Sequence, residues 1–180
     1  MLRTLSVAIL LFVSQFAFAQ QFAGTGSGKL VFGQSGTTHE YRSLSLFSNI
    51  SFYTGKISFH FKTSTFLPVN NSDPNLVNEV FDAGLKGAME FSGTIPAGLK
   101  TLKIKETINT VLKGHMAYGN VKKPIDIPVK LKRVAENKYE LLSSSLLSLP
   151  ALGISPQSAT YKKTDGVARL LVDVILQNEL

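Results

Sequence analysis

The sequence predicts a single all-β domain, an antiparallel barrel or sandwich, with one or two short helices. Three observations predict this class. Apolar and polar residues alternate over many short segments, and turn-forming residues separate those segments. The chain of 180 residues, 44% hydrophobic and 17% charged, is long and apolar enough for one packed core, and it has no cysteine for disulfides or thiolate metal sites.

The alternation is clearest over 56–63, where Ile57, Phe59 and Phe61 alternate with polar residues. A strand places two such sets on opposite faces. The same pattern recurs over 102–109 and 125–132. Further strands are expected at 28–33, 41–53, 88–95, 110–118, 138–146 and 167–177, with turns at 70–74, 96–98, 119–120, 136–137 and 165–166. The glycine-rich residues 20–28 are expected to form a flexible lead.

One segment has helical spacing instead. Asp73 can cap a helix that begins at Pro74, and the apolar residues from Leu76 to Phe81 then share one face. The sequence therefore predicts a short helix over 74–83. A second apolar segment, 146–156, contains two prolines and is expected to form a turn of helix or a buried connection.

Residues 1–19 have the composition of a secretory signal peptide. Arg3 precedes the apolar run 5–13, and Ala17 and Ala19 stand three residues and one residue before Gln20. The apolar stretch is short for a transmembrane helix, which needs about 20 residues, so a retained anchor is the less favoured alternative. We expect an exported chain, periplasmic or extracellular, whose mature domain spans 20–180.

Residue patterns for catalysis are missing from the sequence. His39, His60 and His115 have no ligand partners at metal-binding spacing, and no G-x-S-x-G nucleophile motif occurs. The glycine-rich segment 24–28 precedes a strand and not a helix, so it does not match a dinucleotide or P-loop motif. The sequence predicts no enzyme, no catalytic or metal-binding residue and no cofactor.

Basic residues outnumber acidic ones by nineteen to twelve, which gives a formal charge of +7. Lys100, Lys103 and Lys105 are expected on one strand face, and a second basic group extends from Lys122 to Arg133. Nucleic-acid binding would need arginine and stacking aromatics on the same face, so no nucleic acid is predicted. A solvated face that blocks aggregation is favoured. Weak contact with an anionic membrane surface or a phosphate head group is the alternative, and acidic polysaccharide or protein partners also stay open.

Glu106 is unusual, because the alternation places it on one face with Leu102, Ile104 and Ile108. A carboxylate inside a barrel is costly unless it is paired. Inside the barrel, Glu106 would contact a lysine or a ligand group. The favoured alternative is that a bulge or a strand end places Glu106 in water.

Three segments occur in an order that resembles the YceI-like family of exported lipocalin-like barrels. Residues 111–116, followed by 121–129 with the sequence Val-Lys-Lys-Pro at 121–124, resemble the family hairpin of pattern G-x-L-x-x-x-G-V-T-K-x-V-x-x-P. Residues 147–156 resemble a segment near the C-terminal end of the family pattern, which ends in Gly-Ile-x-x-Pro. Here residues 153–156 read Gly-Ile-Ser-Pro, with one residue fewer before the proline. Residues 75–93 resemble a helix followed by a strand with a Phe-x-Gly sequence, here 91–93.

The resemblance implies an antiparallel lipocalin-like barrel whose interior holds a long apolar molecule, typically an isoprenoid, without catalytic residues. The apolar strand faces and the helix provide the candidate ligand-binding residues Ile57, Phe59, Phe61, Phe81, Met89, Phe91, Ile104, Leu112 and Met116. Alternation alone does not separate a hollow barrel from a filled one. The alternative is therefore a filled barrel that acts as a structural or partner-binding module of the cell envelope. The oligomeric state is not predicted.

Overall fold

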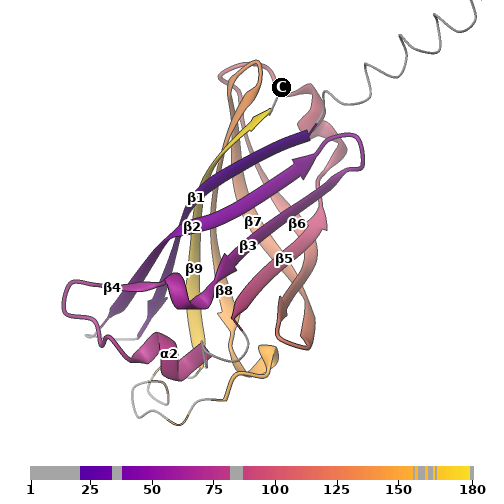
Figure 1. The fold of residues 1–180 in the computed structure, drawn as a ribbon. Coiled ribbons are helices and arrows are strands. Elements are labelled where there is room, and N and C mark those ends of the chain that lie inside the picture. The colour runs from indigo at the N-terminus through magenta and orange to yellow at the C-terminus, as the bar shows by residue number, and fades with distance from the viewer. Residues whose placement is uncertain are drawn as a thin grey trace, which may run out of the picture.

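The computed structural model is an antiparallel β-barrel with short helical segments at its ends (Figure 1). It describes residues 21–33, 38–81, 87–155, 157, 161, 164 and 166–178. The strand order is β1-β9-β8-β7-β6-β5-β3-β2-β4, and pairing of β1 with β2 closes the ring. Because β3 and β4 pair with successive parts of β2, they share one of eight strand positions. The predicted lipocalin-like barrel is confirmed.

The strands tilt across the barrel, and the helix α2 lies at one end (Figure 1). The strands are β1 (Gln21–Phe32), β2 (His39–Ser51), β3 (Lys56–Lys62), β4 (Leu67–Val69), β5 (Ala88–Thr94), β6 (Thr107–Tyr118), β7 (Val121–Ala135), β8 (Lys138–Ser148) and β9 (Val167–Asn178). The helical segments are η1 (Thr63–Thr65), α2 (Leu76–Phe81), η2 (Ala97–Thr101) and η3 (Pro150–Leu152).

The first strand extends through the segment that the sequence predicted to be a flexible lead, so that prediction is wrong. Each of residues 21–28 pairs with β2 or β9, and Phe22, Ala23, Gly26 and Gly28 pair with both. Gly24 and Gly26 permit this, because a Cβ atom on either would fall on the backbone of β9, on the carbonyl oxygens of Ile175 and Asp173 respectively. The glycines therefore serve close approach of two strands and not flexibility.

A β-bulge in β2 changes which residues point inward. Gly26 pairs with Leu46 but Gly28 pairs with Ser43, so β2 has one extra residue at 44–45. Tyr41 and Ser43 are buried before the bulge, and the even-numbered residues from Leu46 onward are buried after it. The exposed Leu44 lies at the bulge.

The strand predicted over 102–109 begins only at Thr107, so its first part is wrong. Lys105 has a φ of 70°, a left-handed conformation that turns the chain and breaks the alternation. Ile104 is consequently 52% exposed and does not line the interior. Lys100 lies in η2, so the three lysines of this segment do not share one strand face. Glu106 is exposed, as favoured, and its carboxylate accepts a hydrogen bond from the Lys103 backbone N–H at 2.7 Å.

Aromatic side chains fill both ends of the barrel. The hairpin end, defined by the β7–β8 turn at 136–137, contains Phe22, Phe52 and Tyr139, whose ring centroids lie 5.0–5.3 Å apart. At the opposite α2 end, Phe81 packs against Phe32 and Tyr118, with centroids 6.4 and 5.8 Å away. Both ends are therefore closed by packed rings.

Arg133 fastens the loop 102–106 to the hairpin end. Its guanidinium donates hydrogen bonds to the carbonyl oxygens of Leu102 at 2.9 Å, Glu136 at 2.8 Å and Ala135 at 3.3 Å. It also lies 5.8 Å from the centroid of the Tyr139 ring. A planar group with several fixed donors suits this role better than an ammonium.

Replacing Arg133 with alanine is expected to lower the free energy of unfolding by about 2 kcal/mol, because hydrogen bonds from a charged donor and a cation–π contact are lost. Arg133→Lys should recover only part of this loss. Urea denaturation measures both values, and Arg169→Ala, at an exposed arginine of β9, is the control with an expected change within about 0.5 kcal/mol. Equal effects at the two arginines would contradict the fastening role.

The strands β7 and β8 separate toward the α2 end. Their pairing runs from the hairpin to Val129 and Ser143 and stops there, although β7 remains paired with β6, and β8 with β9. The Pro128 carbonyl faces β8, since it accepts the Ser143 hydroxyl at 2.8 Å. Pro124 lies four residues earlier on the same edge. Neither proline has an N–H to donate, so this edge of β7 loses ladder hydrogen bonds where the β7–β8 pairing ends.

Residues 1–19, the predicted signal peptide, lie outside the described residues. Within the part of the chain that the structure describes, no helix is long and apolar enough to cross a membrane. The predicted helix at 74–83 is present as α2, with Asp73 Oδ1 accepting the Asn75 backbone N–H at 2.9 Å. The predicted helical turn in 146–156 is present as η3.

Candidate functional site: the barrel interior and the β7–β8 wedge

The barrel interior is lined by the apolar residues that the sequence selected, with the exception of Ile104. Each of the others is at most 3% exposed: Ile57, Phe59, Phe61, Phe81, Met89, Phe91, Leu112 and Met116. Seven of them come from β3, β5 and β6, and Phe81 comes from α2. Because almost none of their surface is accessible to water, these side chains pack closely against their neighbours in the interior. Their assignment as ligand-binding residues stays a prediction.

Phe91 occupies the middle of this lining. Its ring covers the paired glycines Gly93 and Gly114, since a Cβ on either would come within 2.7 Å of the ring. It also stacks on Phe59 at a centroid distance of 5.6 Å. Phe91, Met89 and Met116 are adaptable in shape, by ring rotation or by thioether torsions, so this is the part of the core that can rearrange most readily.

The α2 end is fixed by hydrogen bonds between β2 and the turn that precedes α2. The Tyr41 hydroxyl donates to the Asp73 carbonyl at 2.6 Å. The Ser72 hydroxyl accepts the Glu40 N–H at 2.8 Å and donates to the Val69 carbonyl at 2.7 Å. These contacts hold α2 and therefore Phe81 over the end of the barrel.

Burial, followed by the negative charges of Asp73 and Glu79, raises the pKa of Tyr41 to about 12. The unfolded chain loses this proton near pH 10, so the folded state binds more protons between about pH 10 and 12, and stability falls as pH rises. We expect urea midpoints to decline over this interval and Tyr41→Phe to decline less steeply. Burial also raises the pKa values of Tyr139 and Tyr161, so some decline remains. An unchanged slope in Tyr41→Phe would contradict the assignment.

Polar groups inside the barrel are few and mostly paired. The Ser48 hydroxyl donates to the Ser58 carbonyl at 3.0 Å, and Ser43 and Thr65 share a hydroxyl hydrogen bond of 2.7 Å. Among the described residues, the buried hydroxyls of Thr63 and Ser145 have no hydrogen-bond partner. Ser145 is on the inner face of β8, two residues beyond the point where β8 leaves β7.

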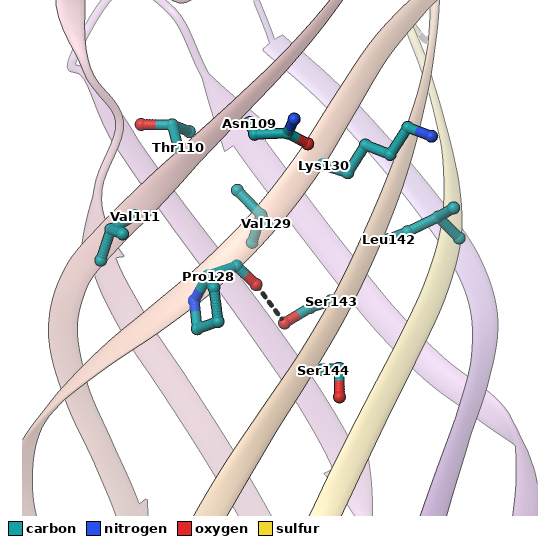
Figure 2. Close-up of a pocket in the computed structure, with 9 residues that line it drawn as sticks. All are labelled: Asn109, Thr110, Val111, Pro128, Val129, Lys130, Leu142, Ser143 and Ser144. Atoms are coloured by element: carbon teal, nitrogen blue, oxygen red, sulfur yellow. Dashed lines mark hydrogen bonds between the residues drawn. The ribbon is translucent and has the colours of Figure 1, made fainter.

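A pocket of about 550 Å³ lies where β7 and β8 separate. It is lined by three consecutive residues from each of three strands: 109–111 of β6, 128–130 of β7 and 142–144 of β8 (Figure 2). We call this place the β7–β8 wedge. In Figure 2 the ribbons of β7 and β8 diverge below the Ser143–Pro128 hydrogen bond. Sequence reasoning missed the wedge, although Pro124 and Pro128 are its visible signal.

Solved structures similar to this barrel were found by comparison of folds. A polyisoprenoid-binding domain from Saccharophagus degradans, described as implicated in plant cell wall breakdown, superposes with a TM-score of 0.68 and 10% identity, covering 89% of this chain and 95% of that one. The fold is that of the YceI-like barrels. BcnA of Burkholderia cenocepacia gives a TM-score of 0.63 at 11% identity, covering 85% and 95%. A mutant CJ YceI protein gives 0.51 at 14% identity, covering 69% and 73%.

These similarities confirm the predicted YceI-like resemblance at the level of the fold. No family model matches the chain, and no curated protein matches it in sequence. At 10–14% identity, the shared feature is the arrangement of strands and not a set of ligand-binding side chains.

Proposed function

We propose that this protein is an exported, non-enzymatic barrel that binds an amphiphilic lipid, isoprenoid-like in its chain, in the apolar interior. The observation that carries the proposal is the lining itself, apolar along β3, β5 and β6, in a barrel whose fold matches a polyisoprenoid-binding domain. Burial of each methylene contributes about 0.8 kcal/mol. A long chain can therefore bind tightly without many polar contacts. The composition of residues 1–19 supports export.

The filled conformation sets a condition on this function. Because the eight buried lining residues have almost no surface accessible to water, a lipid chain that lies among them has to displace some of them. Met89, Met116 and Phe91 are the side chains best able to do so. The bound and free states then differ in core packing, which is a measurable consequence.

A second candidate function follows from the same closed core. A barrel filled by its own side chains needs no ligand to be stable, so it could serve the cell envelope as a structural or partner-binding module. The low exposure of Phe59, Phe81 and Met89 favours this candidate.

Native mass spectrometry of the protein purified from its own host, followed by organic extraction, separates the two candidates. The lipid-binding function predicts an additional mass that extraction removes, and renewed uptake of added polyprenol by the extracted protein. A single apo mass that added polyprenol leaves unchanged would overturn the lipid-binding function and favour the structural module.

A further inference from the structure

The β7–β8 wedge lies at the end of the β7–β8 ladder and is lined by residues of both strand faces. Asn109, Val111 and Lys130 point outward on their strands, whereas Val129 and Ser143 have the inward parity of the core residues. All five line the same 550 Å³ pocket. The pocket covers the last paired positions of β7 and β8, Lys130 with Leu142 and Val129 with Ser143, and beyond them no backbone pairing between the described residues of the two strands closes the wall of the barrel.

Lys130 gives the wedge an ammonium group with no carboxylate opposite it. Lys113 stands opposite Asp126 on the neighbouring strand, and Lys132 stands opposite Glu140. The residues opposite Lys130 are Asn109 and Leu142, which are neutral. Asn109 of β6 lies beside Lys130 (Figure 2), and Thr110, Ser143 and Ser144 add hydrogen-bonding groups elsewhere in the lining of the same pocket. This is the composition of a site for a small anionic group beside apolar surface.

The path from the wedge toward the core follows β8. Ser145, 6% exposed, has a buried hydroxyl without a hydrogen-bond partner in the described structure. Further toward the α2 end, η3 packs against β6 and β7. The loop that contains η3 is hydrogen-bonded within residues 149–166, including the Leu149 N–H to the Gly166 carbonyl at 2.8 Å. Beyond the wedge, the described contacts of this loop with β6 and β7 are therefore packing contacts and not strand pairing.

We propose that the β7–β8 wedge is the lateral mouth of the barrel for a long-chain lipid phosphate. The phosphate binds beside Lys130 in the 550 Å³ pocket, and the chain passes Ser145 into the interior. The inference rests on the proposed lipid-binding function, to which it adds the head-group chemistry and the place of access.

Binding of three probes to the full chain tests the head-group site: a polyprenyl phosphate, the polyprenol of equal chain length, and inorganic phosphate. Lys130→Gln is expected to weaken binding of the polyprenyl phosphate about three- to tenfold, the effect of losing one partly solvated ion pair. The affinity of the Lys130→Gln variant for the polyprenol should equal that of the wild type. Inorganic phosphate should bind at least a hundredfold more weakly than the polyprenyl phosphate, because it lacks the chain.

Lys62→Gln is the matched control, since Lys62 is an equally outward-facing lysine on β3 and the change in net charge is the same. An effect of Lys62→Gln equal to that of Lys130→Gln, or no effect of either, would overturn the head-group site while the lipid-binding function stands. Equal affinity for inorganic phosphate and the lipid phosphate would overturn it as well. A wild-type chain that binds neither lipid would overturn both proposals.

The place of access needs a separate variant. Ser144→Trp should fill the wedge and slow association of both lipids by about fivefold or more, as followed by stopped-flow fluorescence. Ser58→Trp, at an outward-facing serine of β3, is the control and should leave the rate unchanged. Thermal unfolding checks that both variants fold. Wild-type association rates in a folded Ser144→Trp would overturn the wedge as the mouth.

Discussion

Replacing Gly26 with valine is expected to prevent formation of a stable barrel. A Cβ at this position falls on the Asp173 carbonyl oxygen and within 2.9 Å of the Cα and Cβ of Val174. The neighbouring atoms are strand backbone, which cannot rotate away as a side chain can. We expect a loss of about 4 kcal/mol or more, comparable with the whole stability of a small domain. Circular dichroism and urea denaturation should show an unfolded or marginally folded chain.

Gly98→Ala is the matched control, because a Cβ there meets nothing within 4 Å. Gly98 is in η2, where alanine is a better helical residue than glycine, so the expected change is small and can be stabilising. If Gly26→Val unfolded at the same urea concentration as the wild type, β1 and β9 would not approach each other as closely as the structure has them.

Alternation of apolar and polar residues predicted most of the strands because each strand has one face in the core and one in water. β3 is the clearest case, since Ile57, Phe59 and Phe61 are buried while Lys56, His60 and Lys62 are exposed. The same reasoning located β5, β8 and β9. The alternation was therefore sufficient to predict a strand where burial of one strand face is the only strong constraint on the sequence.

The errors lie where backbone geometry, and not burial, decides the structure. Composition alone favours a flexible lead at 20–28, because the effect of Gly24 and Gly26 depends on how near β9 lies, a tertiary fact. The alternation over 102–106 is interrupted by the left-handed Lys105. A non-glycine residue in that conformation leaves no mark in a hydrophobic pattern.

The sequence predicted which residues line the interior of the barrel, but not whether that interior is hollow or filled. The sequence identified Phe59, Met89 and Phe91 as inward-facing, and the structure places them inside. Whether side chains of this kind enclose a cavity or fill one depends on barrel dimensions and rotamers, which the period of two does not encode. The sequence alone shows that Pro124 and Pro128 lack a backbone N–H donor. Only the strand pairing shows that β8 is the neighbour that ends its pairing with β7 here.

Replacing Phe91 with alanine should lower the free energy of unfolding by about 3–5 kcal/mol, the usual cost of removing a buried phenyl ring. The ring lies over Gly93 and Gly114 and stacks on Phe59, so its removal leaves an apolar void that none of these residues can fill. Phe47→Ala removes the same group from the outer face of β2, where Phe47 is 46% exposed, and should cost less than about 1 kcal/mol. Urea denaturation measures both.

The void also distinguishes a barrel that accepts a lipid chain from one that is only filled. If the interior binds a chain by displacing Phe91, the alanine variant no longer has to move that ring, so added polyprenol should raise its unfolding midpoint more than that of the wild type. Phe47→Ala should respond to polyprenol as the wild type does. The opposite result is that polyprenol leaves the unfolding midpoint of Phe91→Ala unchanged. The void would then be present but inaccessible to the lipid chain, and the Phe91 ring would be a structural part of a permanently filled core.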